Sequence, residues 1–237
     1  MFATVLVISL LIIYAFKGFK EGAIVEFVNL VGACLVLAGA FIFKSSVSEI
    51  LYTYLPFLNF NGLFKGLTIL NIILYELIAF CFLAGIFMLI YSVILRATKI
   101  FDKLVKATIV LALPLKIVGI LIGFVEGVIV TFAILFVLNQ ISYTREYIEQ
   151  SNAAQNILEN TPLLSDASKP FSESVNEIYN IAEQYKDNNN KNEANLKSLN
   201  ILLKYRILNP DTAKKLQVSG KLKIDGADKV IEGYLGE

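Results

Sequence analysis

Four long apolar runs constrain the fold of this chain more than any other feature. They cover residues 2–16, 23–43, 67–95 and 115–138. A helix needs roughly 20 predominantly apolar residues to cross the hydrocarbon core of a bilayer, so each run is a candidate membrane span. The first run is short enough to lie in the membrane interface, although we favour a span. Only 17% of the residues are charged and the mean hydropathy is +0.65, which also favours a membrane protein.

The density of charged residues changes near residue 139. Residues 1–139 hold 15 charged side chains, whereas residues 140–237 hold 26. We therefore expect an all-α fold with a four-span transmembrane domain over 1–139 and a polar helical tail over 140–237. Stop signals at Pro162 and Pro170, a polar linker over residues 187–192 and the apolar spacing predict three helices in the tail, over residues 142–160, 171–186 and 194–206. A short helix with Asp211 in its first turn and Gly220 at its end should follow.

The loop charges predict the orientation in the membrane. Six basic residues lie in the loops on one side, namely Lys17, Lys20, Arg96, Lys99, Lys103 and Lys106. The other side has three, namely Lys44, Lys65 and Arg145. Because basic loops stay in the cytoplasm, we expect both hairpin loops inside, and both termini and the tail outside. No basic residue precedes the first run and no cleavage site precedes Gly18, so we expect that helix to be uncleaved.

The composition excludes several classes of function. The chain has no His and no Trp, and its two cysteines, Cys34 and Cys81, both lie in apolar runs. A Ser-His-Asp triad, a Cys-His dyad, a His-ligated metal site and a four-Cys zinc site are therefore excluded. The net charge of +1 does not fit a basic nucleic-acid binder. We expect no enzyme activity, no catalytic residues, no cofactor and no metal.

Small residues in the apolar runs predict where helices pack. Gly119, Gly123 and Gly127 repeat every four residues, which places them on one face of a helix. Small residues let helix backbones approach closely in lipid, so this face should contact protein. Lys116 and Glu126 lie on the same face. The glycines that we assign to helix packing are Gly18, Gly22, Gly119, Gly123 and Gly127.

Three glutamates and one lysine, namely Glu26, Glu76, Glu126 and Lys116, lie within the apolar runs, where charges are costly. At 1.5 Å per residue, Glu76 is roughly 13–14 Å from the outer end of its run and Glu126 roughly 16–17 Å from the inner end. These depths predict that the two carboxyl groups meet near the midplane, with one of them protonated. Glu26 is shallower and should pair with Lys116 or a loop lysine. Two interpretations stay open: a proton or solute path, or polar contacts that fix the helix register.

Two segments of the chain are similar to each other. Residues 18–27 and 123–132 are identical at seven of ten positions, and both run from inside to outside in the expected topology. The similarity indicates a tandem repeat of two helical hairpins.

The same segments carry a resemblance to a known family. Gly18-Phe-Lys-Glu-Gly22, followed by Glu26 and Gly32, and the glycine-rich segment over residues 113–127 resemble the colicin V production (CvpA-like) family of bacterial membrane proteins. The resemblance covers about residues 1–140. The sequence departs from the family where Glu21 follows Lys20, and at Glu126, where the family often has a basic residue.

The resemblance implies a four-helix protein of the bacterial inner membrane that supports export of a peptide toxin, envelope homeostasis or tolerance of membrane stress. It carries over no catalytic residues. We therefore expect a non-enzymatic membrane component, in contact with the lipid bilayer and with either further copies of itself or an envelope protein. One alternative is a small oligomeric channel or transporter that uses Glu26, Glu76, Lys116 and Glu126. The other is a membrane anchor that presents the tail to a partner.

Overall fold

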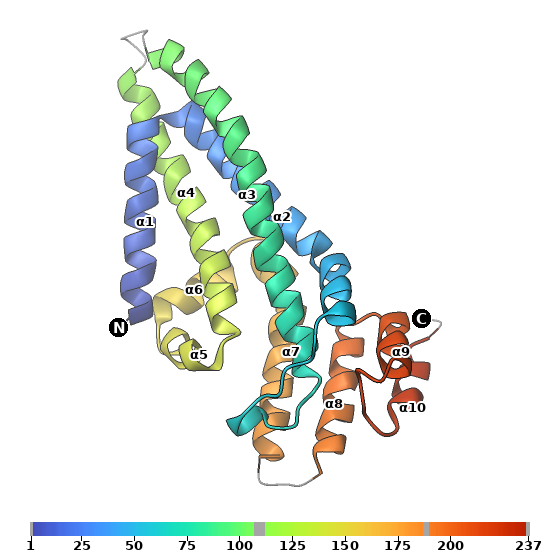
Figure 1. Cartoon of the computed structure of the whole chain (residues 1–237). Coiled ribbons are helices and arrows are strands. Elements are labelled where there is room, and N and C mark those ends of the chain that lie inside the picture. Colours follow the sequence, from blue (N-terminus) through green and yellow to red (C-terminus); the bar gives the residue numbers. More distant parts are fainter. Residues whose placement is uncertain (1, 107–111, 187–189, 236–237) are drawn as a thin grey trace. The chain divides into compact units, whose positions relative to one another are not determined.

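A computed structural model describes residues 2–106, 112–186 and 190–235, and every element in those ranges is a helix. Four long helices come first: α1 (Phe2–Glu21), α2 (Ala23–Tyr54), α3 (Leu70–Lys106) and α4 (Ala112–Asn139) (Figure 1). A short 3₁₀ turn, η1 (Gly62–Phe64), precedes α3. All four long helices contain a segment that is long and apolar enough to cross a membrane, which confirms the predicted all-α, four-span class.

The helices are longer than the apolar runs that predicted them. The first continues through Lys17 to Glu21, and only Gly22 separates it from α2. Gly22 has a φ of +84°, a conformation that glycine adopts without strain, so the chain reverses there in a single residue. At the other end, α2 continues to Tyr54, beyond the predicted end at residue 43. The fourth long helix, α4, begins at Ala112. Pro114 lies in its first turn, where a proline is tolerated because backbone N–H groups have no partner inside the helix there.

The tail contains more helices than predicted. The expected helix over residues 142–160 is divided into α5 (Ser142–Glu149) and α6 (Asn152–Asn160), because the Ser151 hydroxyl caps a new helix by accepting a hydrogen bond from Ala154 N. Pro170, predicted to stop a helix, instead lies inside α7 (Leu164–Gln184). The remaining helices are α8 (Lys191–Lys204), α9 (Pro210–Val218) and α10 (Ala227–Glu232). Of the predicted linker over residues 187–192, residues 187–189 lie outside the described ranges.

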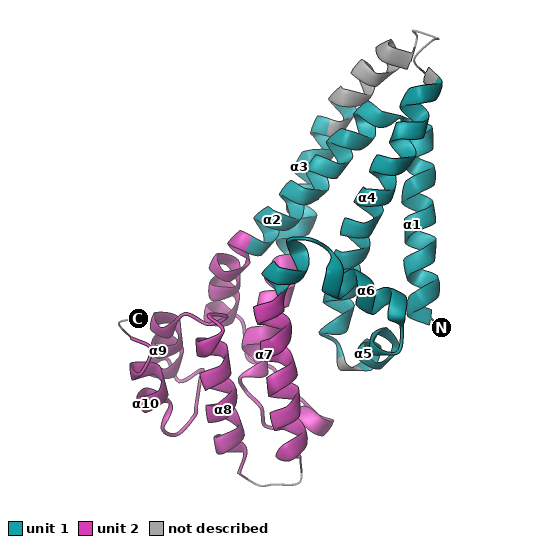
Figure 2. Cartoon of the chain, turned by 180° about the vertical axis from the view of Figure 1, so that it is seen from behind, with its two compact units in different colours: residues 1–41, 82–168 teal, residues 42–81, 169–237 magenta. Residues whose placement is uncertain are grey.

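The chain forms two compact units (Figure 2). Unit 1 comprises residues 1–41 and 82–168, and unit 2 comprises residues 42–81 and 169–237. Each unit combines part of the long helices with part of the tail.

Unit 1 is built around the contact between α1 and α4, which lie side by side in both views (Figures 1 and 2). At the N-terminal end of α1, the short helices α5 and α6 pack against this pair. The buried residues of this contact are Ala3, Val7, Leu135, Ile148 and Ala154. The Thr4 and Ser151 hydroxyl groups are also hydrogen-bonded to each other at 2.9 Å. Apolar side chains and one polar contact thus hold the start of the tail against the membrane helices.

Unit 2 joins the end of α2 and the start of α3 to the helices of the tail. Its largest fully buried apolar side chains are Ile69, Ile72, Ile178, Leu199, Leu202, Leu208, Leu216, Leu222 and Ile231. They come from α3 and its preceding loop, from α7 to α10, and from the turns between those helices. This part of the tail is therefore a helical bundle with an apolar core.

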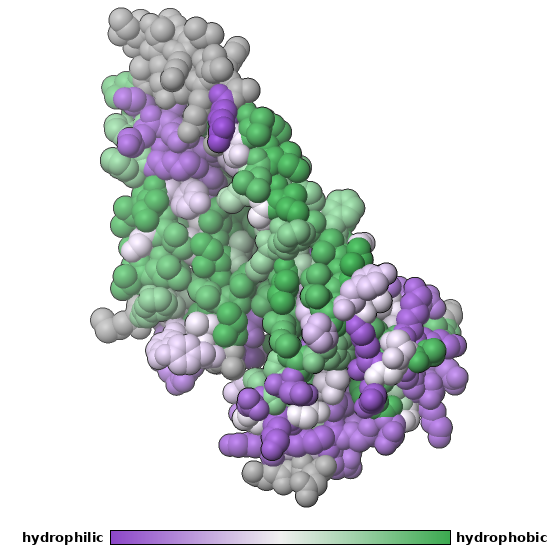
Figure 3. Space-filling model, viewed as in Figure 1, coloured by the Kyte–Doolittle hydropathy of each residue, from purple (hydrophilic) through white to green (hydrophobic). Residues whose placement is uncertain are grey.

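The surface of the chain separates into apolar and hydrophilic regions (Figure 3). Hydrophobic residues cover most of the visible surface of the long helices, and hydrophilic residues cover most of the visible tail in unit 2. Exposed side chains such as Ile12, Leu35, Leu89 and Leu121 lie on the long helices. These apolar faces match contact with the hydrocarbon of a bilayer.

Candidate functional site

The first cluster of buried charges lies where α1, α2 and α4 meet in unit 1. Lys17 Nζ donates to both carboxylate oxygens of Glu126, at 3.0 and 2.9 Å. The same ammonium group is 3.6 Å from Glu26 Oε1. It also lies 5.1 Å from the centroid of the Tyr14 ring. One lysine from α1 therefore connects a carboxylate on α2 to a carboxylate on α4.

Glycine makes this meeting of helices possible. A Cβ at Gly18 would lie 2.0 Å from the carbonyl oxygen of Gly119, and a Cβ at Gly119 would lie 2.2 Å from that of Gly18. A Cβ at Gly123 would lie 2.4 Å from the Tyr14 carbonyl oxygen and 3.0 Å from Glu26 Oε1. These backbones touch directly, as small residues allow in lipid. The close approach brings the α2 carboxylate within reach of the lysine.

An amide and a phenol extend this cluster towards α3. Asn29 Nδ2 donates to Glu26 Oε2 at 3.0 Å and to Glu21 Oε2 at 3.3 Å. Tyr91 OH on α3 donates to Asn29 Oδ1 at 2.5 Å. Polar contacts therefore connect all four long helices within unit 1.

Glu26 is the least satisfied member of the cluster. Its side chain is fully buried, and its Oε1 atom accepts no hydrogen bond from the residues that the structure describes. The Lys17 side chain is 29% exposed, whereas that of Glu126 is 6% exposed. A buried carboxylate oxygen that lacks a donor is unfavourable, so this atom can take a proton or another donor.

The second cluster lies between α2 and α3 in unit 2 and is fully satisfied. Lys44 Nζ donates to Glu76 Oε2, and Ser48 Oγ donates to Glu76 Oε1. Ser45 Oγ adds a weaker contact at 3.4 Å. The Glu76 side chain is 0% exposed and that of Lys44 is 9% exposed. Phe171 on α7 covers the ammonium group, with its ring centroid 5.4 Å from Nζ.

The structure gives Glu76 and Glu126 partners that the sequence did not indicate, whereas the partner of Glu26 is one of the loop lysines that we expected. Glu76 pairs with Lys44 in unit 2, and Glu126 pairs with Lys17 in unit 1. Each has a lysine of its own unit in place of the expected Glu76–Glu126 pair. Glu26 contacts Lys17, a residue that we had assigned to a loop, and Lys116 Nζ instead lies 5.4 Å from the centroid of the Phe19 ring.

The glycines assigned to helix packing lie at contacts between α1 and α4 or at the turn after α1. Gly127 faces Tyr14, since a Cβ there would lie 2.9 Å from the tyrosine Cβ. The two segments of the proposed repeat differ in position. Residues 18–27 contain the turn between two helices, whereas residues 123–132 lie inside α4. The hairpin repeat stays a prediction.

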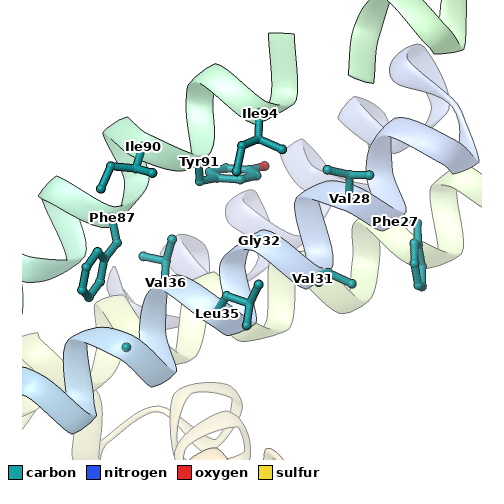
Figure 4. Close-up of a pocket in the computed structure, with 11 residues that line it drawn as sticks. Phe27, Val28, Val31, Gly32, Leu35, Val36, Phe87, Ile90, Tyr91 and Ile94 are labelled. Atoms are coloured by element: carbon teal, nitrogen blue, oxygen red, sulfur yellow. The ribbon is translucent and has the colours of Figure 1, made fainter. Parts of the chain in front are cut away.

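A groove runs between α2 and α3 in unit 1 (Figure 4). Its volume is about 400 Å³. It is lined by Phe27, Val28, Val31, Gly32, Leu35, Val36, Gly39, Phe87, Ile90, Tyr91 and Ile94. The Tyr91 ring lies over Gly32 (Figure 4), where a Cβ would come within 2.2 Å of its Cε2 atom. Phe87 lies similarly against Gly39, where a Cβ would come within 2.9 Å of its Cε2 atom. Sequence reasoning missed this groove, although Gly32 and Gly39 share a helix face and were the available signal.

Two side chains of the tail bind the loop between α2 and α3 in unit 2. Asn195 Oδ1 accepts from Ile69 N at 3.2 Å, and its Nδ2 donates to Gly66 O at 2.8 Å. Lys221 Nζ donates to the carbonyl oxygens of Tyr52, Thr53 and Leu55 at the end of α2. Tyr52 and Thr53 lie in the last turn of α2, where carbonyl groups have no partner inside the helix, so the lysine replaces a helix cap.

Comparison with known proteins identifies the family. The profile of the family described as "Colicin V production protein" matches residues 3–162. The chain belongs to this family. The matched range includes the four long helices and both charge clusters except Phe171. Among the described residues, no group of three or more His, Cys, Asp or Glu side chains could hold a metal ion.

The chain is also similar to the uncharacterized transmembrane protein YshB of Bacillus subtilis (strain 168). The two are 27% identical over 167 residues, which is 68% of this chain and 92% of the relative. No solved structure matches the chain. The family match, the relative and the four apolar helices together describe a multi-pass membrane protein that contacts the lipid bilayer.

Proposed function

We propose that this chain is a non-enzymatic component of the bacterial inner membrane that supports export of a peptide toxin or homeostasis of the envelope. The observation that carries the proposal is the colicin V production family match over residues 3–162. The buried ion pairs support it, because Lys17–Glu126 and Lys44–Glu76 each connect two helices and so act as structural joints. Breaking a buried pair by removing one partner costs about 3–5 kcal/mol, which is enough to disrupt a membrane domain.

Complementation of a deletion strain tests this function. Three versions of the deletion strain would express the wild-type chain, Lys44→Met or Lys65→Met. An immunoblot checks that the three proteins are present in equal amounts. Survival in a membrane-damaging detergent and the amount of secreted peptide toxin are measured. We expect the deletion to impair at least one of the two, the wild type and the exposed-lysine control Lys65→Met to restore it, and Lys44→Met to fail. A deletion strain with both properties unchanged contradicts the proposal.

The predicted orientation belongs to the same proposal. Two of the lysines used to predict it, Lys17 and Lys44, pair with buried glutamates. Leaving them out gives five basic residues on one side and two on the other, which favours the same topology. With both hairpin loops inside, the tail over residues 140–237 is extracytoplasmic. Lys214 is exposed and can be replaced by cysteine in a variant from which Cys34 and Cys81 have been removed. In intact cells without an outer permeability barrier, this cysteine should react with a maleimide that does not cross the inner membrane. A cysteine that reacts only after lysis reverses the topology.

A second function is favoured by one observation, the unsatisfied Glu26 in the first cluster. One partly exposed ammonium group faces two carboxylates there, and Glu26 Oε1 lacks a hydrogen bond among the described residues. Such a group suits a carboxylate-dependent proton or cation path in an oligomeric channel or transporter.

Flux measurements in liposomes separate the two functions. A transporter should show proton or cation flux that Glu26→Gln, at the unsatisfied carboxylate, lowers at least about tenfold. Glu76→Gln changes a carboxylate that is already satisfied by Lys44 and Ser48, so it should reduce flux less. Wild-type liposomes without flux above protein-free vesicles remove the transport function and leave the first proposal standing.

A further inference from the structure

Specific contacts between side chains and glycines form the groove between α2 and α3 in unit 1. Gly32 and Gly39 are seven residues apart, so they lie on the same face of α2. The rings of Tyr91 and Phe87 lie directly against these glycines. Tyr91 is fixed further by its hydrogen bond to Asn29. The two aromatic contacts set the distance between the helices, and the apolar side chains beside them form the groove walls (Figure 4).

The groove lies entirely in segments without charge. Residues 27–43 of α2 and 77–95 of α3 contain no Asp, Glu, Lys or Arg, and the lining residues all belong to these two segments. Several of them are exposed, including Val31 at 40%, Leu35 at 68% and Ile90 at 57%. The groove therefore opens towards the hydrocarbon of the bilayer, and only an apolar group can fill it without a large desolvation cost.

The length of the groove matches one leaflet. The lining residues of α2 extend from Phe27 to Gly39, which at 1.5 Å per residue is about 18 Å. One leaflet contributes about 15 Å to the hydrocarbon core. One end of the groove adjoins Glu26 and Asn29, which belong to the first charge cluster. A chain in the groove would thus have one end beside polar side chains and the rest among apolar ones.

The volume of the groove is too small to enclose a helix. An α-helix about 10 Å across occupies roughly 120 Å³ for each residue of rise, so about 400 Å³ would hold only three residues. A methylene group fills about the same volume as a water molecule, roughly 30 Å³. The groove therefore has room for a hydrocarbon chain of roughly a dozen methylene groups.

We propose that this groove is a lipid site that holds one acyl chain of a membrane phospholipid, from the leaflet that borders the Lys17–Glu126 cluster. The occupant follows from the apolar lining, the opening towards hydrocarbon, the length of about one leaflet and the small volume. The site does not depend on the function proposed above.

Native mass spectrometry of the detergent-purified protein tests the site. The wild type should retain one phospholipid per protomer after lipids on other surfaces have been removed. Val31→Trp and Ile90→Trp place an indole in the groove from opposite walls, and both positions are exposed enough to tolerate it. Each should lower retention about tenfold, the factor expected from losing two buried methylene groups. Val93→Trp, on α3 outside the groove and 66% exposed, is the matched control and should retain lipid as the wild type does.

Fluorescence gives a second measurement, because the chain has no Trp of its own. Leu35→Trp places a fluorophore at the groove and Val93→Trp places one on an ordinary lipid-facing surface. Both are reconstituted with phospholipids brominated in the acyl chain and then diluted into detergent. Quenching should persist at position 35 and disappear at position 93.

Three results would overturn the proposal. The first is a wild-type protein that retains no lipid in mass spectrometry, together with equal recovery of tryptophan fluorescence at positions 35 and 93. The second is unchanged lipid retention in both groove variants. The third is a loss of oligomeric mass in Val31→Trp, measured by light scattering, without loss of lipid; that result assigns the groove to a second copy of the chain.

Discussion

The two charge clusters differ in how completely their carboxylates are satisfied. In unit 2, Glu76 has a lysine and two serine hydroxyl groups as partners, and both charges are almost entirely buried. In unit 1, Lys17 serves two carboxylates and is partly exposed, and Glu26 keeps an oxygen without a hydrogen bond among the described residues. The first arrangement fixes two helices to each other. The second has unused capacity to bind a proton or a cation.

The largest effect should come from breaking the satisfied pair. Lys44→Met leaves Glu76 buried without a cation, so the free energy of unfolding should fall by about 3–5 kcal/mol. The double variant Lys44→Met/Glu76→Leu removes both charges and should recover most of this loss. Thermal unfolding in detergent, followed by circular dichroism, measures both. Equal stability of the single and double variants contradicts the assignment of this pair as a structural joint.

The next effect should come from the glycine contact that assembles the first cluster. A Cβ at Gly18 meets a backbone carbonyl that can only move with its helix, so Gly18→Ala should lower the free energy of unfolding by about 1–3 kcal/mol. Gly85 is the control, since a Cβ there meets nothing within 4 Å. Gly85→Ala should be neutral or should stabilise α3 by up to about 1 kcal/mol. Equal destabilisation by Gly18→Ala and Gly85→Ala would mean that the close approach of the α1 and α4 backbones does not contribute to stability.

Removing the lysine of the first cluster should cost less than removing that of the second. Lys17 is 29% exposed, so water can reach the carboxylates once it is gone. We expect Lys17→Met to lower the free energy of unfolding by about 1–2 kcal/mol, between the values for exposed and buried pairs. The same unfolding assay compares it with Lys44→Met. A larger loss for Lys17→Met reverses the contrast between the clusters.

The smallest effect should come from the exposed ion pair between Lys197 and Glu193 in the tail. The stability that this pair contributes in water is the value with which both clusters are compared. The Tyr185 hydroxyl and then Lys197 lower the pKa of Glu193. A carboxyl group with a lowered pKa stabilises the fold at pH values above its pKa in the unfolded chain, which is about 4.3 for Glu. This stabilisation is lost as the pH falls through the pKa of the group in the folded protein. The melting temperature of the wild type should therefore fall slightly more than that of Glu193→Gln between pH 6 and pH 3. Parallel profiles would show that the pair contributes nothing.

The sequence predicted the four candidate spans because length and hydropathy are properties of each helix alone. It placed Gly119, Gly123 and Glu126 on one face for the same reason, since helical periodicity is local. It did not predict the partners of Glu76 and Glu126. Lys17 and Lys44 looked like loop residues because they follow apolar runs, but each lies inside a helix that continues beyond its run. Which carboxylate a lysine meets depends on the axial offset between two helices, and single-helix periodicity does not determine that offset.

The binding of the tail to the α2–α3 loop has a consequence for how the chain is made. Ile69 N meets Asn195, which follows it by 126 residues, and Tyr52 O meets Lys221, which follows it by 169 residues. Bacterial ribosomes add roughly 5–20 residues per second, so these groups lack their partners for roughly 10–30 s after they are synthesised. The loop between the second and third helices is therefore a late-maturing part of the nascent protein. A chain truncated before Lys221 should leave the ribosome with that loop accessible to proteases.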